Sequence, residues 1–211
     1  RLGIMRAVIV EEPGDIEALN IEETPTPTPQ PGEVLVRTVA AGVNRADLLQ
    51  RRGYYPPPKG ITDIIGLEAS GVVEATGDGV TKWQPGDEVV ALLAGGGYAE
   101  YFVVPEGQLI APPPSVDLVT AAGLLEVAAT VVSNMDVAGL KPGETLLVHG
   151  GAGGVGTFAT QYAKALGAYV VATAGSDPKL LHCLAHGAEV ALDYHGDWVD
   201  GVRQATGGHG A

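Results

Sequence analysis

The sequence predicts two domains: a β-rich domain forming a partly open barrel in residues 1–116, and an α/β domain in residues 117–211. Three observations predict this division. Short β-rich runs, bounded by Gly, Pro or Asp turn signals, fill residues 5–110. From residue 117 the chain is rich in Ala, with apolar residues at helical spacing. Strand-like and helix-like segments then alternate, which is typical of a parallel sheet with helices on its faces.

The first domain contains one helical segment among its strands. The stretch "NRADLLQRRG" predicts a helix over residues 44–53 that ends at Gly53. The Pro-rich segment 24–32 predicts an extended connector between two strands, because proline favours extended backbone. Antiparallel strands are expected in residues 5–12, 33–43, 69–77, 87–94 and 98–105.

The second domain begins with helices in residues 117–139 and then alternates. Ser176 is expected to cap a helix, since Pro178 lies in its first turn and Gly187 just past its end. Strands are expected in residues 145–150, 168–175 and 188–194, and helices in residues 157–167, 177–187 and 197–208. A doubly wound sheet has two such halves and only the first is present, so we expect a chain truncated within this domain.

Composition narrows the class of protein. With 12 basic and 25 acidic residues the formal net charge is −13, which argues against a nucleic-acid partner because phosphate backbones are bound by clustered Lys and Arg. No apolar run is long and uncharged enough to span a bilayer, and the N-terminus lacks a signal-peptide pattern. We therefore expect a cytoplasmic protein with no membrane partner. A single cysteine, Cys183, leaves no disulfide framework and no cysteine-rich zinc lobe.

A glycine-rich segment in the second domain predicts a dinucleotide site. It matches G-x-G-x-x-G, follows an apolar strand and precedes an amphipathic helix, and this context separates the motif from a plain glycine-rich turn. Gly151 is expected to permit the tight turn, Gly153 to let the backbone approach a pyrophosphate, and Gly156 to let the helix pack on the strand. The N–H groups at the helix start would bind the phosphates. The predicted cofactor residues here are Gly151, Gly153, Gly154, Val155 and Gly156.

The end of the second strand favours NADPH over NADH. An NAD enzyme has an acid there, about 20 residues after the motif, but position 176 is Ser. Asp177 is adjacent and keeps an NAD site open, although an acid is favoured in the first turn of any helix. Ser176 can donate a hydrogen bond to a 2′-phosphate, and Lys179 can neutralise it. Gly175 and Tyr194, near the ends of the second and third strands, are further candidates, although Tyr194 would serve equally well in strand packing.

The two halves together resemble a known family. The segments "AAGVNRADL", "GLEASGVV" and "PGDEVV", followed by "HGGAGGVG", resemble the medium-chain dehydrogenase/reductase superfamily, most closely its quinone oxidoreductase branch, which is related to zeta-crystallin. The resemblance extends over residues 5–211. It implies a GroES-like catalytic domain, a Rossmann domain, an active site in the cleft between them, and a homodimer for the full-length protein.

The resemblance also bears on metal binding. Zinc-using members of the superfamily have Cys at the position of Asn44, His at that of Leu67, and Cys or an acid near Glu126. Catalytic zinc needs three protein ligands from His, Cys or carboxylate, and Leu67 cannot bind a metal. We therefore predict no catalytic zinc. The hydride acceptor must then be electron-poor already, as a quinone or an activated enone is.

Residues 44–55 supply the catalytic candidates. Asn44 has an amide donor directly after a strand, and such donors can stabilise the oxyanion that forms on a quinone. Asp47 could orient a ribose hydroxyl, although helix capping is the more common role of an acid at this position. The resemblance implies that Tyr55 lines the active site as a phenol donor or substrate platform, with Tyr54 as the alternative.

Three more residues have roles that the sequence only outlines. Thr130 lies four residues after Glu126 on one helical face, and it resembles a cofactor-contacting threonine of the family. The role of Glu126 is open. Glu68 is the only charge in residues 64–73, and because buried charges are paired, we expect it to lie against a cation as a structural anchor.

The resulting hypothesis is an NADPH-dependent, zinc-independent quinone oxidoreductase. An enoyl or enone reductase of the same superfamily is the first alternative. A non-catalytic NADPH-binding fragment is the second, since the truncation would remove the rest of the cofactor domain.

Overall fold

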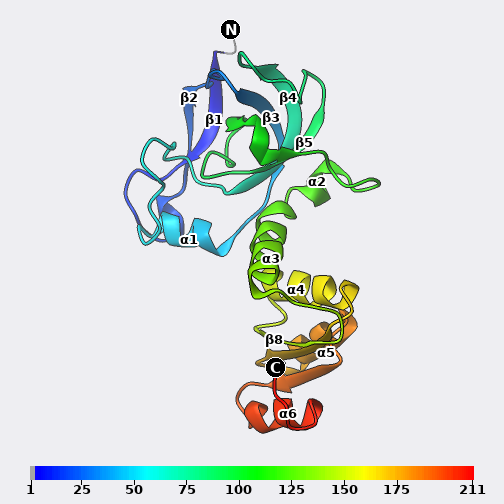
Figure 1. The fold of residues 1–211 in the computed structure, drawn as a ribbon. Coiled ribbons are helices and arrows are strands. Elements are labelled where there is room, and N and C mark those ends of the chain that lie inside the picture. Colours follow the sequence, from blue (N-terminus) through cyan, green and yellow to red (C-terminus); the bar gives the residue numbers. More distant parts are fainter. Residues whose placement is uncertain (1–2) are drawn as a thin grey trace. The chain divides into compact units, whose positions relative to one another are not determined.

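The computed structural model describes residues 3–211, and the chain divides into two compact units (Figure 1). The first unit ends at Glu126 and the second begins at Val127. The expected order, a β-rich part followed by an α/β part, is confirmed. None of the helices in residues 3–211 has the length and apolar character that crossing a membrane requires.

A five-stranded antiparallel sheet supplies the main core of the first unit. Its strands are β3 (Glu33–Ala41), β4 (Glu68–Thr76), β5 (Glu88–Leu92), β6 (Tyr101–Pro105) and β7 (Leu109–Ile110), in the spatial order β6-β3-β4-β5-β7. The β3–β4 register shifts twice, and such irregularities bend a sheet. The buried apolar residues of this core are Val34, Val36, Ala69, Val73, Val89, Ala91, Leu93, Phe102, Val104 and Leu109.

A second, two-stranded sheet joins β1 (Ile4–Ile9) to β2 (Asn20–Pro25). Strand β2 was missed by the sequence analysis because it is mostly exposed, so it lacks the apolar alternation that marks a half-buried strand. It also takes up the first two residues of the expected Pro-rich connector. Pro25 lies at the last position of the strand, where proline is tolerated at a sheet edge.

Short helices complete the first unit. Helix α1 (Arg45–Arg51) lies where the sequence predicts it, and Gly53 follows with φ +78°, a left-handed conformation that glycine adopts readily. Helix α2 (Leu118–Ala121) is capped by Asp117, whose carboxylate accepts from the Thr120 N–H. Single 3₁₀ turns occupy Ile16–Ala18 and Glu106–Gln108.

The second unit is a three-stranded parallel sheet with helices packed on it, as the alternation predicts. The strands are β8 (Thr145–His149), β9 (Tyr169–Ala174) and β10 (Val190–Asp193), in the order β10-β9-β8. The helices are α4 (Gly154–Ala165), α5 (Asp177–Ala185) and α6 (Trp198–Ala205), and most of α3 (Leu125–Ala138) also belongs to this unit. Helix α4 begins three residues earlier than expected, inside the glycine motif itself.

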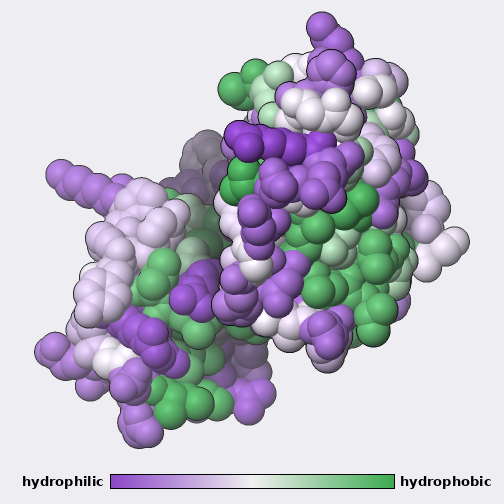
Figure 2. All heavy atoms as spheres, turned by 90° about the horizontal axis from the view of Figure 1, so that it is seen from below, coloured by the Kyte–Doolittle hydropathy of each residue, from purple (hydrophilic) through white to green (hydrophobic). Residues whose placement is uncertain are grey.

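Several large apolar side chains remain on the surface, and Figure 2 shows hydrophobic residues gathered in areas bordered by hydrophilic ones on the face it presents. The most exposed aliphatic residues are Val137, at 90%, Val43, at 77%, and Ile21, at 75%. They come from three different parts of the chain. Scattered exposed apolar residues of this kind are ordinary on protein surfaces.

Gly71 tests the packing of the central strand pair. It faces Thr38 across the β3–β4 ladder, and a Cβ at Gly71 would lie 2.7 Å from Val36 Cγ1 and closer still to the Arg37 carbonyl oxygen. We expect Gly71→Ala to lower the free energy of unfolding by about 1–3 kcal/mol, measured by urea denaturation. Gly107→Ala is the control, since nothing lies within 4 Å of its Cβ position. Equal stability of the two variants would contradict this packing.

Candidate functional site

The glycine motif forms the turn between β8 and α4. Gly150 has φ +67° and makes the left-handed turn, one residue before Gly151, where the sequence analysis placed it. Gly153 is the N-cap of α4 in extended conformation, and Gly154 and Val155 are exposed at the start of the helix. The first N–H groups of a helix have no carbonyl partner within it, so this exposed end suits an anion.

Two glycines of the motif are required by close packing. A Cβ at Gly151 would lie 2.8 Å from both Ala172 Cβ and Cys183 Sγ. A Cβ at Gly156 would lie 2.7 Å from Gly151 Cα. The sequence predicted that Gly156 lets the helix pack on the strand, whereas the close contact at Gly156 is with the turn, at Gly150 and Gly151. The free thiol of Cys183 is buried beneath the motif, and burial raises its pKa.

A pocket of about 160 Å³ opens beside this turn. Gly153, Gly175, Lys179 and Tyr194, all predicted cofactor residues, line it together, although they come from four different segments of the second unit. A Cβ at Gly175 would collide with the Tyr194 phenol, so the absence of a side chain at Gly175 makes room for that ring. The complete lining is Gly150, Ala152, Gly153, Ala174, Gly175, Lys179 and Tyr194.

Six predicted cofactor residues are outside the pocket lining: the motif residues Gly151, Gly154, Val155 and Gly156, and also Ser176 and Thr130. Ser176 is the exposed N-cap of α5, directly after the lining residue Gly175, and its hydroxyl makes no capping hydrogen bond. The chain connectivity therefore keeps Ser176 at the rim of the pocket. Thr130 lies on α3, where its carbonyl oxygen accepts from Asn134 Nδ2 at 2.7 Å.

A separate cluster of buried polar groups lies in the first unit, where α1 begins. Asp47 is 3% exposed, and its Oδ2 accepts from the Asn44 N–H at 2.7 Å and from the Tyr98 hydroxyl at 2.8 Å. Its Oδ1 is buried without a hydrogen-bond partner among residues 3–211. Burial and the hydrogen bond to Asp47 raise the pKa of Tyr98. Asp47 therefore holds the start of the helix, the capping role that the sequence also allowed.

Glu68 is the most buried charged residue of this cluster, at 1% exposure. Its Oε1 accepts from Asn44 Nδ2 at 2.8 Å, and its Oε2 accepts from the Glu126 backbone N–H at 3.0 Å. The expectation of a cationic partner is wrong: among residues 3–211 no ion pair reaches Glu68. Neutral amide donors solvate the carboxylate instead, which satisfies its oxygens without a second buried charge.

Glu126 lies next to this cluster at the start of α3. Burial, and the charges of Glu68 and Asp47, raise the pKa of its carboxyl group. Each effect disfavours the ionised form, burial because the charge loses solvation and the neighbours because they carry the same charge. Among the described residues, no group of three or more His, Cys, Asp or Glu side chains is placed to hold a metal ion.

The tyrosine that joins the cluster is Tyr98, for which the sequence suggested no role. Tyr55 and Tyr54 follow Gly53 in a loop, and their side chains are 48% and 78% exposed. Tyr98 joins the cluster instead, from a loop directly after Gly95–Gly97. The only signal in the sequence was an aromatic residue after three glycines. A Cβ at Gly66 would lie 2.7 Å from Tyr98 Cδ1, so the ring lies close against backbone.

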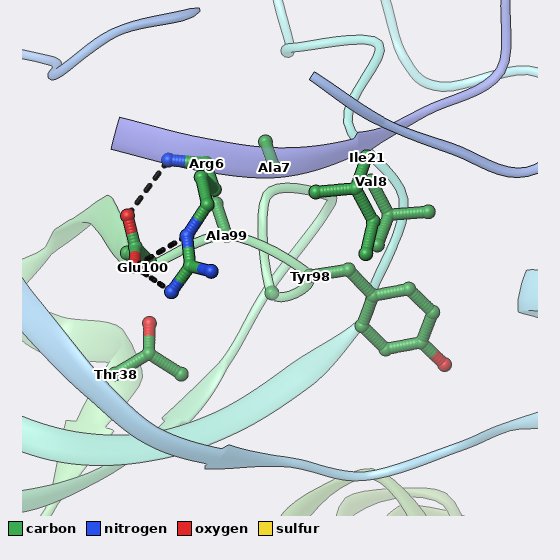
Figure 3. Close-up of a pocket in the computed structure, with 9 residues that line it drawn as sticks. Arg6, Ala7, Val8, Ile21, Thr38, Tyr98, Ala99 and Glu100 are labelled. Carbon is green, nitrogen blue, oxygen red and sulfur yellow. Dashed lines mark hydrogen bonds and ion pairs between the residues drawn. The ribbon is translucent and has the colours of Figure 1, made fainter. Parts of the chain in front are cut away.

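The ring of Tyr98 also lines a larger concavity of about 410 Å³ beside β1 and β2 (Figure 3). Its walls are mostly apolar, and Val8 and Ile21 lie on the same side as the Tyr98 ring. An ion pair between Arg6 and Glu100, 2.7 Å long, closes one side, and the Tyr98 ring extends away from it. Local sequence patterns did not indicate this concavity, because it forms between segments far apart in the chain.

Family models match both units. Residues 30–115 match the model described as "Alcohol dehydrogenase GroES-like domain", and residues 154–211 match the one described as "Zinc-binding dehydrogenase". Among curated proteins, the chain is 39% identical over 184 residues to a quinone oxidoreductase of Pseudomonas aeruginosa, covering 86% of this chain and 56% of that one. It is 38% identical over 201 residues to a pikromycin polyketide synthase component of Streptomyces venezuelae, covering 94% of this chain and 5% of that component.

Solved structures show the same fold. The Escherichia coli quinone oxidoreductase complexed with NADPH aligns with a TM-score of 0.84 at 31% identity, covering 98% of this chain and 63% of that one. An NAD-dependent alcohol dehydrogenase aligns with a TM-score of 0.86 at 36% identity, covering 98% of this chain and 69% of that one. The chain thus spans a little over half to two thirds of these three dehydrogenase and oxidoreductase relatives.

The pKa of Glu126 provides a test of the electrostatic coupling between Glu68 and Glu126. Because the negative charge of Glu68 disfavours ionisation of Glu126, Glu68→Gln should lower the pKa of Glu126 while leaving it above its ordinary value through burial. A ¹³C NMR titration of the Glu126 carboxyl group measures this. Glu74→Gln is the control, since Glu74 lies on the same strand but is exposed. An unchanged pKa in Glu68→Gln would refute the coupling.

Proposed function

Because the chain belongs to the medium-chain dehydrogenase/reductase superfamily and is of its quinone oxidoreductase type, we propose that it takes part in the NADPH-dependent, zinc-independent reduction of a quinone. The observation that carries the proposal is the pocket beside the glycine turn, where Lys179 and Tyr194 meet the motif. The cofactor fits these residues because Gly150 and Gly153 carry no side chain where they line the pocket, and Lys179 brings a positive charge to it. When bound, a reduced nicotinamide supplies a hydride.

Features of the second unit support NADPH rather than NADH as the cofactor. The exposed start of α4, at Gly154 and Val155, would hold the pyrophosphate. Lys179 would neutralise the 2′-phosphate, with the Tyr194 phenol beside it and Ser176 at the rim. None of the described lining residues is an acid, whereas a ribose-binding acid is the usual feature of NAD sites. The NADPH-bound relative supports this assignment, and the NAD-dependent relative supports the alternative cofactor.

The first unit supplies the hydrogen-bond donor that we assign to the substrate oxygen. A quinone that accepts hydride becomes a hydroquinone monoanion, and one proton from solvent completes the hydroquinone. Asn44 is the candidate donor to the developing oxyanion, since a fixed amide N–H stabilises such a charge without reorganisation. Asp47 holds the backbone of Asn44 in place. Tyr55 remains the candidate platform for the quinone ring.

Lys179 tests the cofactor assignment. Lys179→Glu replaces a positive charge with a negative one beside the proposed 2′-phosphate, so KM for NADPH should rise by about tenfold or more while KM for NADH changes little. Steady-state kinetics of the full-length protein with both cofactors measure the ratio. Lys141→Glu is the matched control, because Lys141 is exposed in the same unit and outside the pocket. Equal changes for NADPH and NADH would overturn the assignment.

Assays with several hydride acceptors, before and after treatment with a chelator, test both the substrate class and the predicted independence from zinc. We expect the full-length protein to oxidise NADPH with 1,4-benzoquinone or 9,10-phenanthrenequinone, and to keep that rate after treatment with a chelator. Enoyl-CoA turnover without quinone turnover would replace the proposal with an enoyl reductase. A rate that falls after chelation and returns with Zn²⁺ would refute zinc independence.

A further inference from the structure

We propose that Glu68 is a positioning residue that fixes the amide of Asn44 for the reaction. This inference rests on the proposed function, in which the Asn44 amide donates a hydrogen bond to the oxyanion that forms on the substrate. Glu68 begins β4, Asn44 immediately precedes α1, and the two are 24 residues apart in the chain. Their side chains meet at 2.8 Å between Glu68 Oε1 and Asn44 Nδ2.

The surroundings of Glu68 leave its side chain little freedom. A Cβ at Gly42 would lie 2.6 Å from the Glu68 Cδ and 2.7 Å from its Cγ, so the carboxylate occupies the space that a side chain at position 42 would fill. The Gly42 N–H also donates to the Glu68 carbonyl oxygen at 3.2 Å. The second oxygen, Oε2, is held by the Glu126 N–H at 3.0 Å. The carboxylate is therefore fixed at both oxygens and along its stem.

A fixed carboxylate determines which way the Asn44 amide faces. A carboxylate accepts and does not donate, so the NH₂ side of the amide must be the side that faces Glu68. The amide carries two N–H bonds, and Glu68 takes one of them. At the same time Asp47 binds the Asn44 backbone N–H at 2.7 Å, and Tyr98 holds Asp47 in turn. Asn44 is thus held through its backbone by one buried acid and through its side chain by another.

Such an arrangement suits a catalytic donor better than a structural residue alone. A donor that stabilises an oxyanion must be held in place before the charge forms, and a small misplacement costs a large part of the rate. The ionised acceptor also makes the hydrogen bond to Asn44 charge-assisted, which strengthens it. Glu68 is too buried, at 1% exposure, to contact a substrate itself. It would act only through Asn44.

Glu68→Gln breaks this arrangement with almost no change in volume. Glutamine offers one oxygen and one NH₂ group, so it can accept from Asn44 or from the Glu126 N–H but not from both. In the full-length protein we expect kcat to fall by about tenfold to a hundredfold, measured well below the melting temperature, with KM for NADPH unchanged. Glu74→Gln, on the same strand and exposed, should leave kcat at the wild-type value. A Glu68→Gln variant with wild-type kcat would overturn the proposal.

A double-mutant cycle separates positioning from general destabilisation. Asn44→Ala alone should lower kcat, and adding Glu68→Gln to it should lower kcat no further, because Glu68 acts through a side chain that is gone. If Glu68→Gln lowers kcat by the same factor in both backgrounds, Glu68 acts independently of Asn44. If Asn44→Ala keeps the wild-type kcat, Asn44 is not the donor. Either result refutes the positioning role.

An NMR measurement separates failure of this inference from failure of the proposed function. The Asn44 side-chain NH₂ protons should show one strongly hydrogen-bonded resonance in the wild type that is lost in Glu68→Gln and kept in Glu74→Gln. The kinetic cycle is run with whichever acceptor, quinone or enone, the wild type reduces. A protein that reduces neither acceptor, yet shows the NMR change, would refute the proposed reaction and the catalytic part of the inference but not the contact. Loss of activity in Glu68→Gln without the NMR change would refute the contact.

Discussion

A buried carboxylate held by amide donors rather than by a cation organises the first unit. Glu68 is 1% exposed, and its two oxygens are satisfied by Asn44 Nδ2 and by the Glu126 N–H. Burying a charge is costly unless hydrogen bonds replace the lost solvation, so loss of either donor would destabilise the first unit. The consequence is that the start of β4, the start of α1 and the start of α3 are tied at one point.

The second unit depends on a different constraint, the close approach of backbone to backbone. Gly151 and Gly156 have no room for a side chain, and Gly175 leaves its space to the ring of Tyr194. Glycine at these positions permits close packing, while the neighbouring Gly153, Gly154 and Val155 leave the start of α4 exposed, where an anion can bind. The sequence motif therefore has a steric reason at each of these positions. Lys179 then gives the pocket a positive charge. In our proposal this charge favours NADPH over NADH, because only NADPH carries a 2′-phosphate.

The order of elements followed from the sequence with few errors, because turn residues and apolar periodicity are local signals. The exceptions have physical causes. Strand β2 is exposed and carries no apolar alternation, and α4 starts inside a glycine-rich segment that has poor helix propensity. Gly150, rather than Gly151, makes the left-handed turn, since a motif fixes the spacing of glycines but not which neighbour takes positive φ.

By itself the sequence determined the two-part organisation, the family resemblance, the cofactor motif and the residue types around the pocket, because each of these depends on residues near one another in the chain. The tertiary structure alone decided the partners of Glu68, the contact of Tyr98 with Asp47, and the meeting of Gly153, Gly175, Lys179 and Tyr194 around one pocket. Glu68 and Glu126 are 58 residues apart, and Tyr98 and Asp47 are 51 apart. No local pattern records such contacts, because a buried acid can be satisfied by a cation or by amides, and only the packing of distant segments selects between them.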